Sequence, residues 1–297
     1  MKKSRFVCFL LALWLGLGAS AQVGLGGSAQ VTFSRADSLT ICRLLHDAPQ
    51  EASTLWFARQ FLGVPYVAHT LEVNDGEQLV VNTRQLDCTT LVETATALAL
   101  CIAKEQRRWD DYLSMLKNLR YRQGVIDGYT SRLHYFTDWI LDKQQMAMVS
   151  EIQQPHPPFT AVQKLDIHFM GRHPQYYKAL KAHPDLLPEI RRQEAALTGR
   201  TFRYIPKREV KNTRLLRQTI HDGDIIAITC NKPGLDIAHL GFAVWRKDGL
   251  HLLNASQLHK KVVEEPMTLY SYLQKHPSHT GIRIVRLVKG NKKTVNR

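Results

Sequence analysis

The period of the hydrophobic pattern changes near residue 200, and this change limits the folds open to the chain. Before it, apolar residues recur every three to four positions, as in residues 34–62, which is the spacing of one buried helix face. After Phe202 the apolar runs are short and typical of strands. These runs cover residues 222–230, 239–245, 250–256 and 281–288. Helices first and strands second predict an α+β fold with a C-terminal antiparallel sheet.

The same patterns predict individual elements. We expect helices over residues 34–48, 50–63, 109–120 and 131–144, a helix that begins at Cys88, and a helical stretch broken by prolines over 173–197. Asn74-Asp75-Gly76 predicts a hairpin turn between short strands. The chain has 297 residues, 44% of them apolar, which is enough for one large core. We therefore expect a single domain over residues 34–297, preceded by a flexible Gly-rich segment over 22–33.

The N-terminus has the pattern of a secretory signal peptide. Lys2, Lys3 and Arg5 precede an apolar run, and Ala19-Ser20-Ala21 follows it as a cleavage site. The run is too short and wrongly flanked for a good membrane span. The interpretation is a signal peptide over residues 1–21 and a periplasmic or secreted protein without a membrane span after cleavage.

Four cysteines follow the predicted cleavage site: Cys42, Cys88, Cys101 and Cys230. An exported chain could join them in two disulfides, but a core of this size does not require them, so the state of Cys42 and Cys230 stays open. No cysteine or histidine spacing is typical of a zinc site. Three further histidines, His168, His173 and His183, lie in a loop-like stretch that contains prolines, without a set of carboxylates. We expect no metal and no organic cofactor.

The net charge of +14 is strongly basic. For an exported protein it favours anionic partners such as cell-wall peptides, anionic lipid or extracellular polymer. The alternative is a solvated basic surface with no specific partner. Nucleic acid is a poorer match, because no signature of a nucleic-acid-binding fold is visible. The sequence says nothing about oligomeric state.

Cys88 combines two features of a cysteine nucleophile. It starts a helix whose apolar positions recur every three to four residues as far as Ile102, and Asp87 is a good N-cap for that helix. A thiol in the first turn feels the positive end of the helix dipole, which predicts a lowered pKa. The alternative is a small core residue, which is how we interpret Cys101 deeper in the same helix.

A base and a residue to orient it follow on two later strands. His239 opens one strand, a turn follows near Arg246, and Asn254 lies on the next strand. Paired residues of an antiparallel hairpin have a constant sum, and a turn there makes the sum odd. Asn254 then shares a face with His239 while His251 points to the other face, and Gly241 leaves room between them. We expect Asn254 Oδ1 to accept from His239 Nδ1–H, with Nε2 facing the thiol. The alternative is a capped or surface histidine.

Four segments together resemble the NlpC-like superfamily of papain-type cell-wall hydrolases. They are "GVPYV" (63–67), "LDCTTLVE" (86–93), "HLGFAV" (239–244) and "LLNAS" (252–256). The resemblance implies a papain-like NlpC-type core, in which a helix-borne cysteine packs on an antiparallel sheet. Asn254 stands where many members have histidine. Thr89-Thr90 replaces the Ser-Gly that often follows the cysteine, and no Gly-Gly follows Tyr66.

The chain is more similar to the branch of amidases that act on 1,6-anhydro-N-acetylmuramoyl-L-alanine muropeptides. "SRLHYFTDWI" (131–140) and "GLDIAHLGFAV" (234–244) add to the motifs above, and the similarity runs from Ser53 to Val288. The resemblance implies one cysteine amidase domain over residues 34–297. A helical insertion over 109–196, absent from minimal members, would shape its cleft.

The resemblance assigns roles to particular residues. Cys88 attacks the amide, His239 is the base and Asn254 orients it, while the Cys88 N–H and the Tyr66 hydroxyl are oxyanion donors. The candidate substrate-binding residues are Tyr66, Asp87, Thr89, Arg132, His134 and Tyr135. Surface pairing on a helix, which would include Asp138, is the alternative for the last three. Two rival functions stay open: an endopeptidase that cuts between D-Glu and the diamino acid, and a catalytically silent wall-binding protein.

Overall fold

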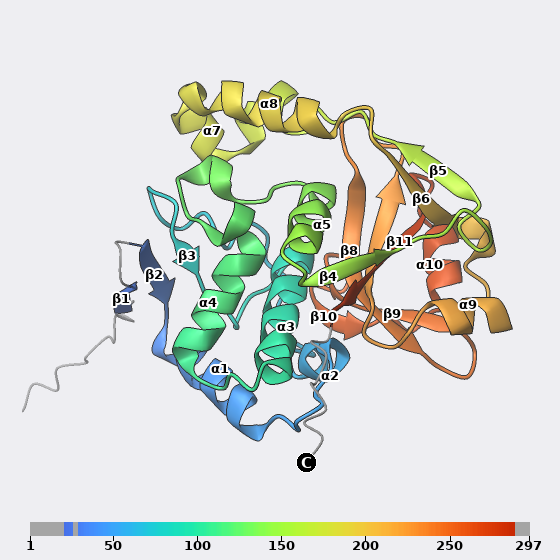
Figure 1. Cartoon of the computed structure of the whole chain (residues 1–297), viewed down its shortest axis with the longest axis horizontal. Helices are drawn as coiled ribbons and strands as arrows, with labels where there is room; N and C mark the ends of the chain where they lie inside the picture. The colour runs from blue at the N-terminus through green and yellow to red at the C-terminus, as the bar shows by residue number, and fades with distance from the viewer. Residues whose placement is uncertain (1–20, 26–28, 289–297) are drawn as a thin grey trace, which may run out of the picture.

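A computed structural model describes residues 21–25 and 29–288 of the chain. The predicted signal peptide, apart from Ala21, lies outside these residues. Helices gather on one side of the molecule and a large antiparallel sheet on the other (Figure 1). The chain is thus mixed α/β.

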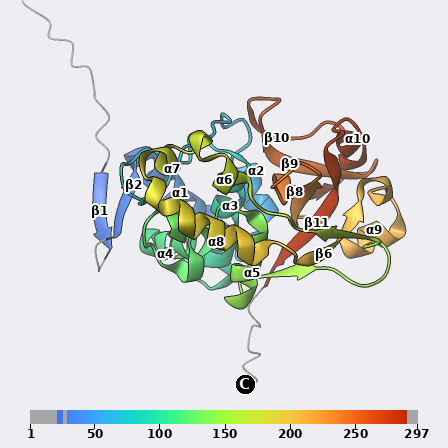
Figure 2. The ribbon, with the colours of Figure 1, turned by 90° about the horizontal axis from the view of Figure 1, so that it is seen from above.

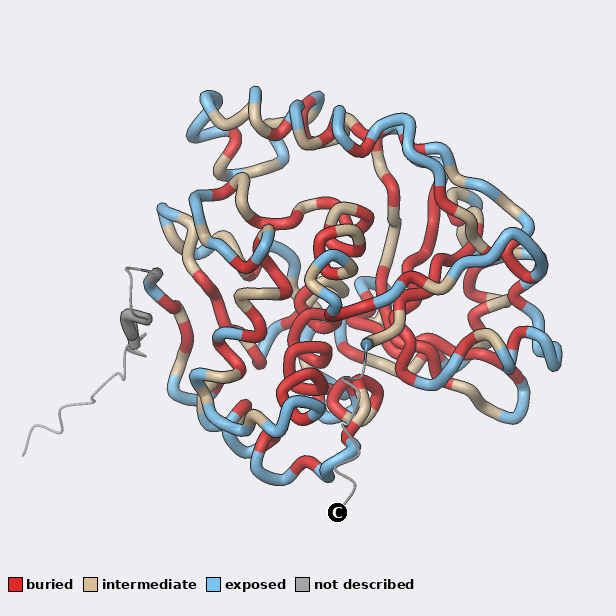
Figure 3. The backbone as a smooth tube through the Cα atoms, in the orientation of Figure 1, coloured by how far each residue is buried: buried red, intermediate tan, exposed pale blue. Residues whose placement is uncertain are grey.

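Five α-helices form the N-terminal half of the part of the chain that the structure describes. They are α1 (Arg35–Asp47), α2 (Thr54–Arg59), α3 (Cys88–Ala103), α4 (Trp109–Arg120) and α5 (Phe136–Gln145). Helix α3 is the central one, because it contacts α1, α2 and α4 as well as β8 and β9 of the sheet. Every residue from Thr90 to Ile102 is buried. A helix that is apolar on all sides belongs inside a core, and Figure 3 shows α3 buried for most of its length.

The sheet has the strand order β10-β9-β8-β7-β11-β6-β5, and β4 also pairs with β11. Among the described residues, neighbouring strands of this sheet pair antiparallel. The strands are β4 (Val149–Ile152), β5 (Ala161–Lys164), β6 (Thr201–Pro206), β7 (Ile225–Cys230), β8 (Ile237–Trp245), β9 (Leu250–Ser256), β10 (Lys261–Glu264) and β11 (His279–Leu287). The four runs that the sequence indicated became β7, β8, β9 and β11. Strands β4 and β5 join them from the helical half of the chain.

Both faces of this sheet are covered. Alternate residues of β7 point to opposite sides: Ile225 and Ala227 pack with the core of α1–α5, while Ile226 and Ile228 pack with α9 (Arg214–Thr219) and α10 (Leu269–Gln274). Because successive residues of a strand point to opposite faces and both faces are covered, every residue of β7 is buried. In β8, Leu240 and Phe242 pack with the core of α1–α5, whereas His239, which pairs with Ile228, alternates with them and belongs to the α9–α10 side.

The chain between β5 and β6 forms a further group of short helices. It comprises α6 (Phe169–Arg172), α7 (Lys178–Ala182) and α8 (Leu187–Leu197), with 3-10 turns at 174–176 and 184–186. Pro174 and Pro184 open those turns, as expected of a helical stretch broken by prolines. This group has its own small core, which includes Tyr135 of the segment before α5. Seen from above, α6 and α8 lie across α3 and α5 (Figure 2).

The helix predicted over 131–144 begins later than expected, at Phe136. Residues 129–131 form a 3-10 turn, and Arg132 pairs with Tyr121 in an isolated antiparallel bridge. The Asp236 carboxylate accepts the Thr137 N–H at 2.7 Å in the first turn of α5. An acidic group from the segment just before β8 therefore sets the start of this helix, which local sequence could not indicate.

Two predictions near the N-terminus were wrong. Asn74-Asp75-Gly76 is not a hairpin turn: the short strand β3 (Leu79–Val80) that follows pairs in parallel with β2 (Ala29–Phe33). Residues 22–33 also contain strands, because β2 pairs with β1 (Ala21–Leu25). The buried side chain of Val31 holds β2 against the core of α1–α5. In the described part of the chain no helix is long and apolar enough to cross a membrane.

Candidate active site

Cys88 is the first residue of α3, and a reciprocal cap fixes its backbone. The Asp87 carboxylate accepts the Thr90 N–H at 2.8 Å, and the Thr90 hydroxyl accepts the Asp87 N–H at 2.9 Å. This capping box satisfies two backbone groups at the start of the helix. The Thr90 hydroxyl also donates to the Asp87 carboxylate at 2.8 Å. Asp87 Oδ1 thus holds the helix start, Asp87 is not among the residues that line the cavity beside Cys88, and its role as a substrate contact stays a prediction.

His239 and Asn254 share one face of the β8–β9 hairpin, as the register argument predicted. Phe242 pairs with Leu253, so the residue numbers of paired positions have an odd sum. The His239 ring lies 2.9 Å from Asn254 Oδ1. His251, by contrast, bonds the Glu265 carbonyl at 2.9 Å on the other face. A Cβ on Gly241 would lie 2.6 Å from the Leu253 carbonyl oxygen, so only glycine allows the strands to approach this closely.

The ring nitrogen that binds Asn254 differs from the prediction. The contact is made by His239 Nε2, where Nδ1 was expected. By the hairpin register Asn254 lies opposite Gly241, one pair along from His239, so the ring reaches it with its outer nitrogen. Nδ1 is therefore the nitrogen left for a thiol.

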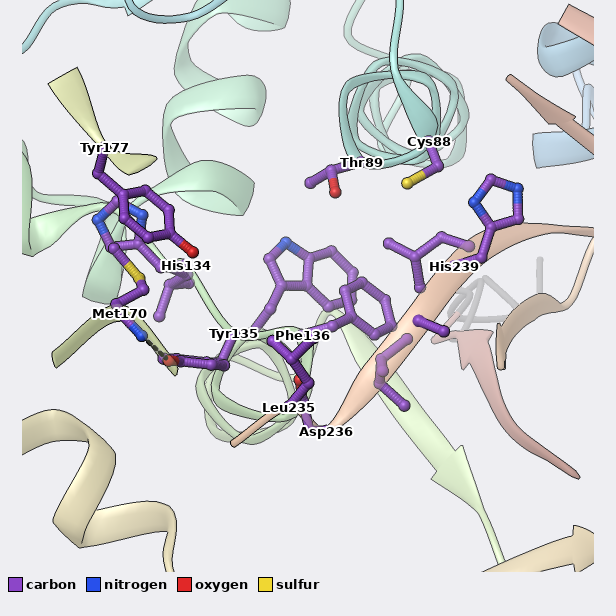
Figure 4. A pocket seen from close by; sticks show the side chains of 15 residues that line it. Cys88, Thr89, His134, Tyr135, Phe136, Met170, Tyr177, Leu235, Asp236 and His239 are labelled. Carbon is purple, nitrogen blue, oxygen red and sulfur yellow. Dashed lines mark hydrogen bonds between the residues drawn. The ribbon is translucent and has the colours of Figure 1, made fainter. Parts of the chain in front are cut away.

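Cys88 and His239 stand together at one end of a cavity of about 240 Å³ (Figure 4). Cys88 and Thr89 come from α3, whereas Met170 and Tyr177 lie at the far end (Figure 4). The lining consists of Cys88, Thr89, Leu133, His134, Tyr135, Phe136, Trp139, Met170, Tyr177 and residues 235–240. Segments from α3, α5, β8 and the region of α6 and α7 thus build one small chamber beside the thiol.

Burial sets the protonation states of the pair. Burial, followed by the neighbouring Asp87 charge, raises the pKa of the Cys88 thiol to about 12, although hydrogen bonds from Leu240 and Thr89 act in the opposite direction. The lowered pKa predicted from the helix dipole was wrong, because the loss of solvation outweighs the dipole. Burial also lowers the pKa of His239, against the opposing effects of Asn254 and Glu265. The free protein therefore holds a neutral thiol beside a neutral imidazole at neutral pH.

His134, Tyr135 and Thr89 line the cavity, as their role as substrate contacts requires. Burial, followed by the Arg132 charge, lowers the pKa of His134 to about 3, so this ring is neutral. The Tyr135 hydroxyl donates to Glu194 Oε1 at 2.7 Å and accepts the Met170 N–H at 2.9 Å. The hydroxyl therefore links α6 and α8 to the start of α5, while Tyr135 also lines the cavity.

Arg132 and Tyr66 lie outside that lining. Arg132 is buried between Glu72 and Glu77, 3.6 and 3.5 Å away, and lines a separate cavity of about 400 Å³. A guanidinium already paired with two carboxylates is a poor receptor for a substrate carboxylate, so the structure does not bring it into the site. Tyr66 packs beside Cys88, and burial, followed by the Cys88 and Asp87 charges, raises its pKa. Its hydroxyl is thus within electrostatic range of the thiol.

Sequence reasoning missed several members of the site. The buried Trp139 lines the cavity, and its Nε1–H has no hydrogen-bond partner among the described residues. On an apolar helix stripe such a tryptophan is indistinguishable from core. Behind Asn254, the Glu265 carboxylate accepts from Asn254 Nδ2 at 3.0 Å. The His259 ring lies 3.1 Å from the same carboxylate. They follow β9 in an ordinary polar stretch, and nothing in their spacing marked them.

The four cysteines after residue 21 are all free thiols. Within residues 21–25 and 29–288, no group of three or more His, Cys, Asp or Glu side chains is placed to hold a metal ion.

Comparison with protein families gives one match. Residues 56–282 match the model of a family described as AmiA-like, N-acetylmuramoyl-L-alanine amidase-like. No curated protein matches the sequence.

Solved structures are similar over most of the chain. An N-acetylmuramoyl-L-alanine amidase from Bacteroides uniformis is 38% identical with a TM-score of 0.75, covering 81% of this chain and 99% of its own. A Bacteroides fragilis protein described as a candidate xylanase is 41% identical with a TM-score of 0.73, covering 78% and 99%. A Legionella pneumophila protein is 22% identical, covers 85% and 95%, and has a TM-score of 0.66, which shows a shared fold alone.

Proposed function

Because the chain belongs to the AmiA-like, N-acetylmuramoyl-L-alanine amidase-like family, we propose that it hydrolyses the amide between N-acetylmuramic acid and L-alanine in peptidoglycan fragments, with Cys88 as nucleophile. One observation carries the mechanism. Cys88 at the start of α3 and His239, held by Asn254 at 2.9 Å, stand together on the wall of one cavity. The pair lies where a helix packs on an antiparallel sheet, which supports a papain-like NlpC-type core as part of the proposal.

Catalysis begins from the neutral pair. His239 Nδ1 takes the thiol proton as Cys88 Sγ attacks the amide carbonyl carbon, and a tetrahedral oxyanion forms. The proton then passes to the leaving amine of L-alanine, the C–N bond breaks and a thioester remains. Water, deprotonated by His239, hydrolyses the thioester, and the proton returns to the thiol. The Cys88 backbone N–H, free of an intrahelical partner at the helix start, and the Tyr66 hydroxyl are the proposed oxyanion donors.

The chemistry of the cavity suits the sugar side of the substrate. No Lys or Arg lines it, and His134 is neutral. Its one lining carboxylate, Asp236, already accepts the Thr137 N–H. A stem peptide with several carboxylates would require cations there, whereas an uncharged sugar requires apolar rings and a few polar groups. The stacked rings of Phe136 and Trp139, 4.9 Å apart, supply such a wall.

The unpartnered Trp139 Nε1–H is the donor we assign to the acetamido carbonyl of the sugar. A buried donor without a partner costs free energy, and a substrate acceptor would recover it. This small chamber also favours a compact terminal sugar, which is the basis for proposing the 1,6-anhydro form as the preferred substrate.

A glycosidase is a weaker interpretation of this site. Glycoside hydrolysis uses a pair of carboxyl groups across the scissile bond. The cavity beside Cys88 has only Asp236 of that kind, and its Oδ2 is engaged by α5. The amidase proposal also includes export from the cytoplasm, on the basis of the charged and apolar pattern of residues 1–21.

The test is incubation of purified protein with a defined anhydro-muropeptide, followed by mass spectrometry of the products. We expect a free peptide that begins with L-alanine together with the free anhydro sugar. Cys88→Ala should abolish both products, and Cys101→Ala, a buried cysteine of the same helix, is the matched control that should retain them. Cleavage inside the peptide would support the endopeptidase. Absence of any cleavage, with a Cys88 that resists alkylation, would support a silent wall-binding protein.

A further inference from the structure

We propose that Glu265 is a positioning residue, which fixes the orientation of the Asn254 amide and, through it, the tautomer of the His239 ring. The inference rests on the proposed function only in assigning the chemistry to Cys88 and His239. It places a carboxylate behind the orienting asparagine, where it holds the side-chain amide.

Glu265 is held in a defined place behind Asn254. Its carboxylate is almost fully buried, and Oε1 accepts from Asn254 Nδ2 at 3.0 Å. Oε2 lies 3.1 Å from the ring of the half-buried His259. Its backbone is fixed as well, because Glu265 N–H donates to the Leu252 carbonyl at 2.8 Å and its carbonyl contacts the His251 ring at 2.9 Å.

These contacts impose one direction on the chain of hydrogen bonds. An ionised carboxylate only accepts, so the NH₂ end of the Asn254 amide must face Glu265. The oxygen end of the amide must then face His239 Nε2, 2.9 Å away. Because an amide oxygen only accepts, Nε2 must carry the proton. Nδ1 is left with its lone pair free, which is the form that can take a proton from Cys88.

Without Glu265 the amide loses this constraint. A flipped Asn254 would present NH₂ to Nε2 and favour the tautomer with the proton on Nδ1, which cannot act as the base. The buried carboxylate also favours the imidazolium that forms when His239 takes the thiol proton. Asp87, His276 and His279 also act on the His239 ring; Asp87 acts in the same direction as Glu265, and His276 acts in the opposite direction.

The experiment compares Glu265→Gln with Glu264→Gln in the full-length protein. Glutamine at 265 has nearly the same shape, but it carries no charge and can face Asn254 with either end. Glu264 is the neighbouring carboxylate, and it pairs with Arg59 and Arg246 outside this chain of hydrogen bonds. The readouts are the pH dependence of Cys88 alkylation by iodoacetamide, followed by peptide mass spectrometry, and of kcat on an anhydro-muropeptide.

We expect Glu265→Gln to lower kcat by about tenfold and to move the acid limb of both profiles to lower pH by about half a unit or more. Glu264→Gln should leave both profiles in place. In an Asn254→Ala background, Glu265→Gln should cause less than a twofold further loss, because the two residues act in series. A purely structural role for Glu265 would lower the melting temperature without moving the acid limb.

The alkylation profile separates this inference from the proposed function. If the protein cleaves no muropeptide but Glu265→Gln still shifts the alkylation profile, the substrate is wrong and the positioning role stands. An unshifted profile in a folded Glu265→Gln protein would overturn the positioning role, whatever the substrate. Equal losses from Glu265→Gln in the wild-type and Asn254→Ala backgrounds would overturn it too.

Discussion

At the scale of single residues, burial decides how the Cys88–His239 pair works. The pKa of the thiol is raised to about 12 and that of the imidazole is lowered, so both groups are neutral near pH 7. The base is lost only when the pH falls through the lowered pKa of His239. We therefore predict that kcat/KM for an anhydro-muropeptide is retained at pH 6.5 and declines below it. A pH–rate profile measures this, and an acid limb above pH 6.5 would contradict it.

The hairpin register predicts which neighbour of His239 matters for turnover. Asn254→Ala removes the acceptor at Nε2 and should lower kcat on the order of 100-fold. His251→Ala should affect kcat less, since this buried ring serves the other face of β9, but it should destabilise the fold by about 1–3 kcal/mol through lost hydrogen bonds. Steady-state kinetics and thermal melts of both variants check this. A larger loss of kcat in His251→Ala would mean that the register argument assigns the wrong residue.

Residues whose role follows from local rules were accessible from sequence. The Asp87 cap requires only the spacing of Asp87 and Thr90, and the pairing of His239 with Asn254 requires only the parity of a hairpin. The pKa of Cys88 was not accessible, because the strands and α5 that bury it come from distant parts of the chain. Glu265 and Trp139 were missed for the same reason.

At the scale of elements, the Tyr135 hydroxyl links helices α6 and α8 to the cavity beside Cys88. Tyr135→Phe leaves Glu194 and the Met170 N–H without this partner, so it should cost about 1–3 kcal/mol of stability. Because α6 carries Met170 into the cavity, we also expect KM to rise while kcat changes little. Tyr176→Phe is the matched control, since Tyr176 is exposed, and it should behave as wild type. A fall in kcat with an unchanged KM would contradict this role.

Elements differed in how well the sequence predicted them. Helix α4 matched its prediction over Trp109–Arg120, because its apolar stripe and polar ends are encoded in the same segment. The start of α5 at Phe136 depends on Asp236, about one hundred residues later, and β3 depends on its parallel partner β2. Elements fixed by long-range partners were therefore the ones with wrong boundaries.

At the scale of the whole molecule, the site is a chamber built from distant segments. Helix α3 supplies the thiol and β8 the imidazole, while the insertion between them supplies Met170 and Tyr177 at the far end (Figure 4). Helices α6 and α8 of this insertion lie across α3 and α5 in the view from above (Figure 2). A long glycan strand requires an open groove that continues past the scissile bond, whereas the cavity beside Cys88 has a volume of only about 240 Å³.

Substrate size should therefore control the rate. We predict that the protein releases the L-alanine-led peptide fastest from an anhydro-muropeptide, at least about tenfold more slowly from the same muropeptide with an ordinary reducing-end sugar, and poorly from intact sacculi. The tenfold figure corresponds to about 1.4 kcal/mol of differential transition-state binding, the scale of one lost contact in a small pocket. Time courses of peptide release from the three substrates at equal bond concentration measure this. Trp139→Phe, which keeps the apolar wall but removes the unpartnered Nε1–H, should narrow the preference for acetylated over de-acetylated sugar. Equal rates on all three substrates would mean that the chamber opens for polymers, and the specificity assigned to it would be wrong.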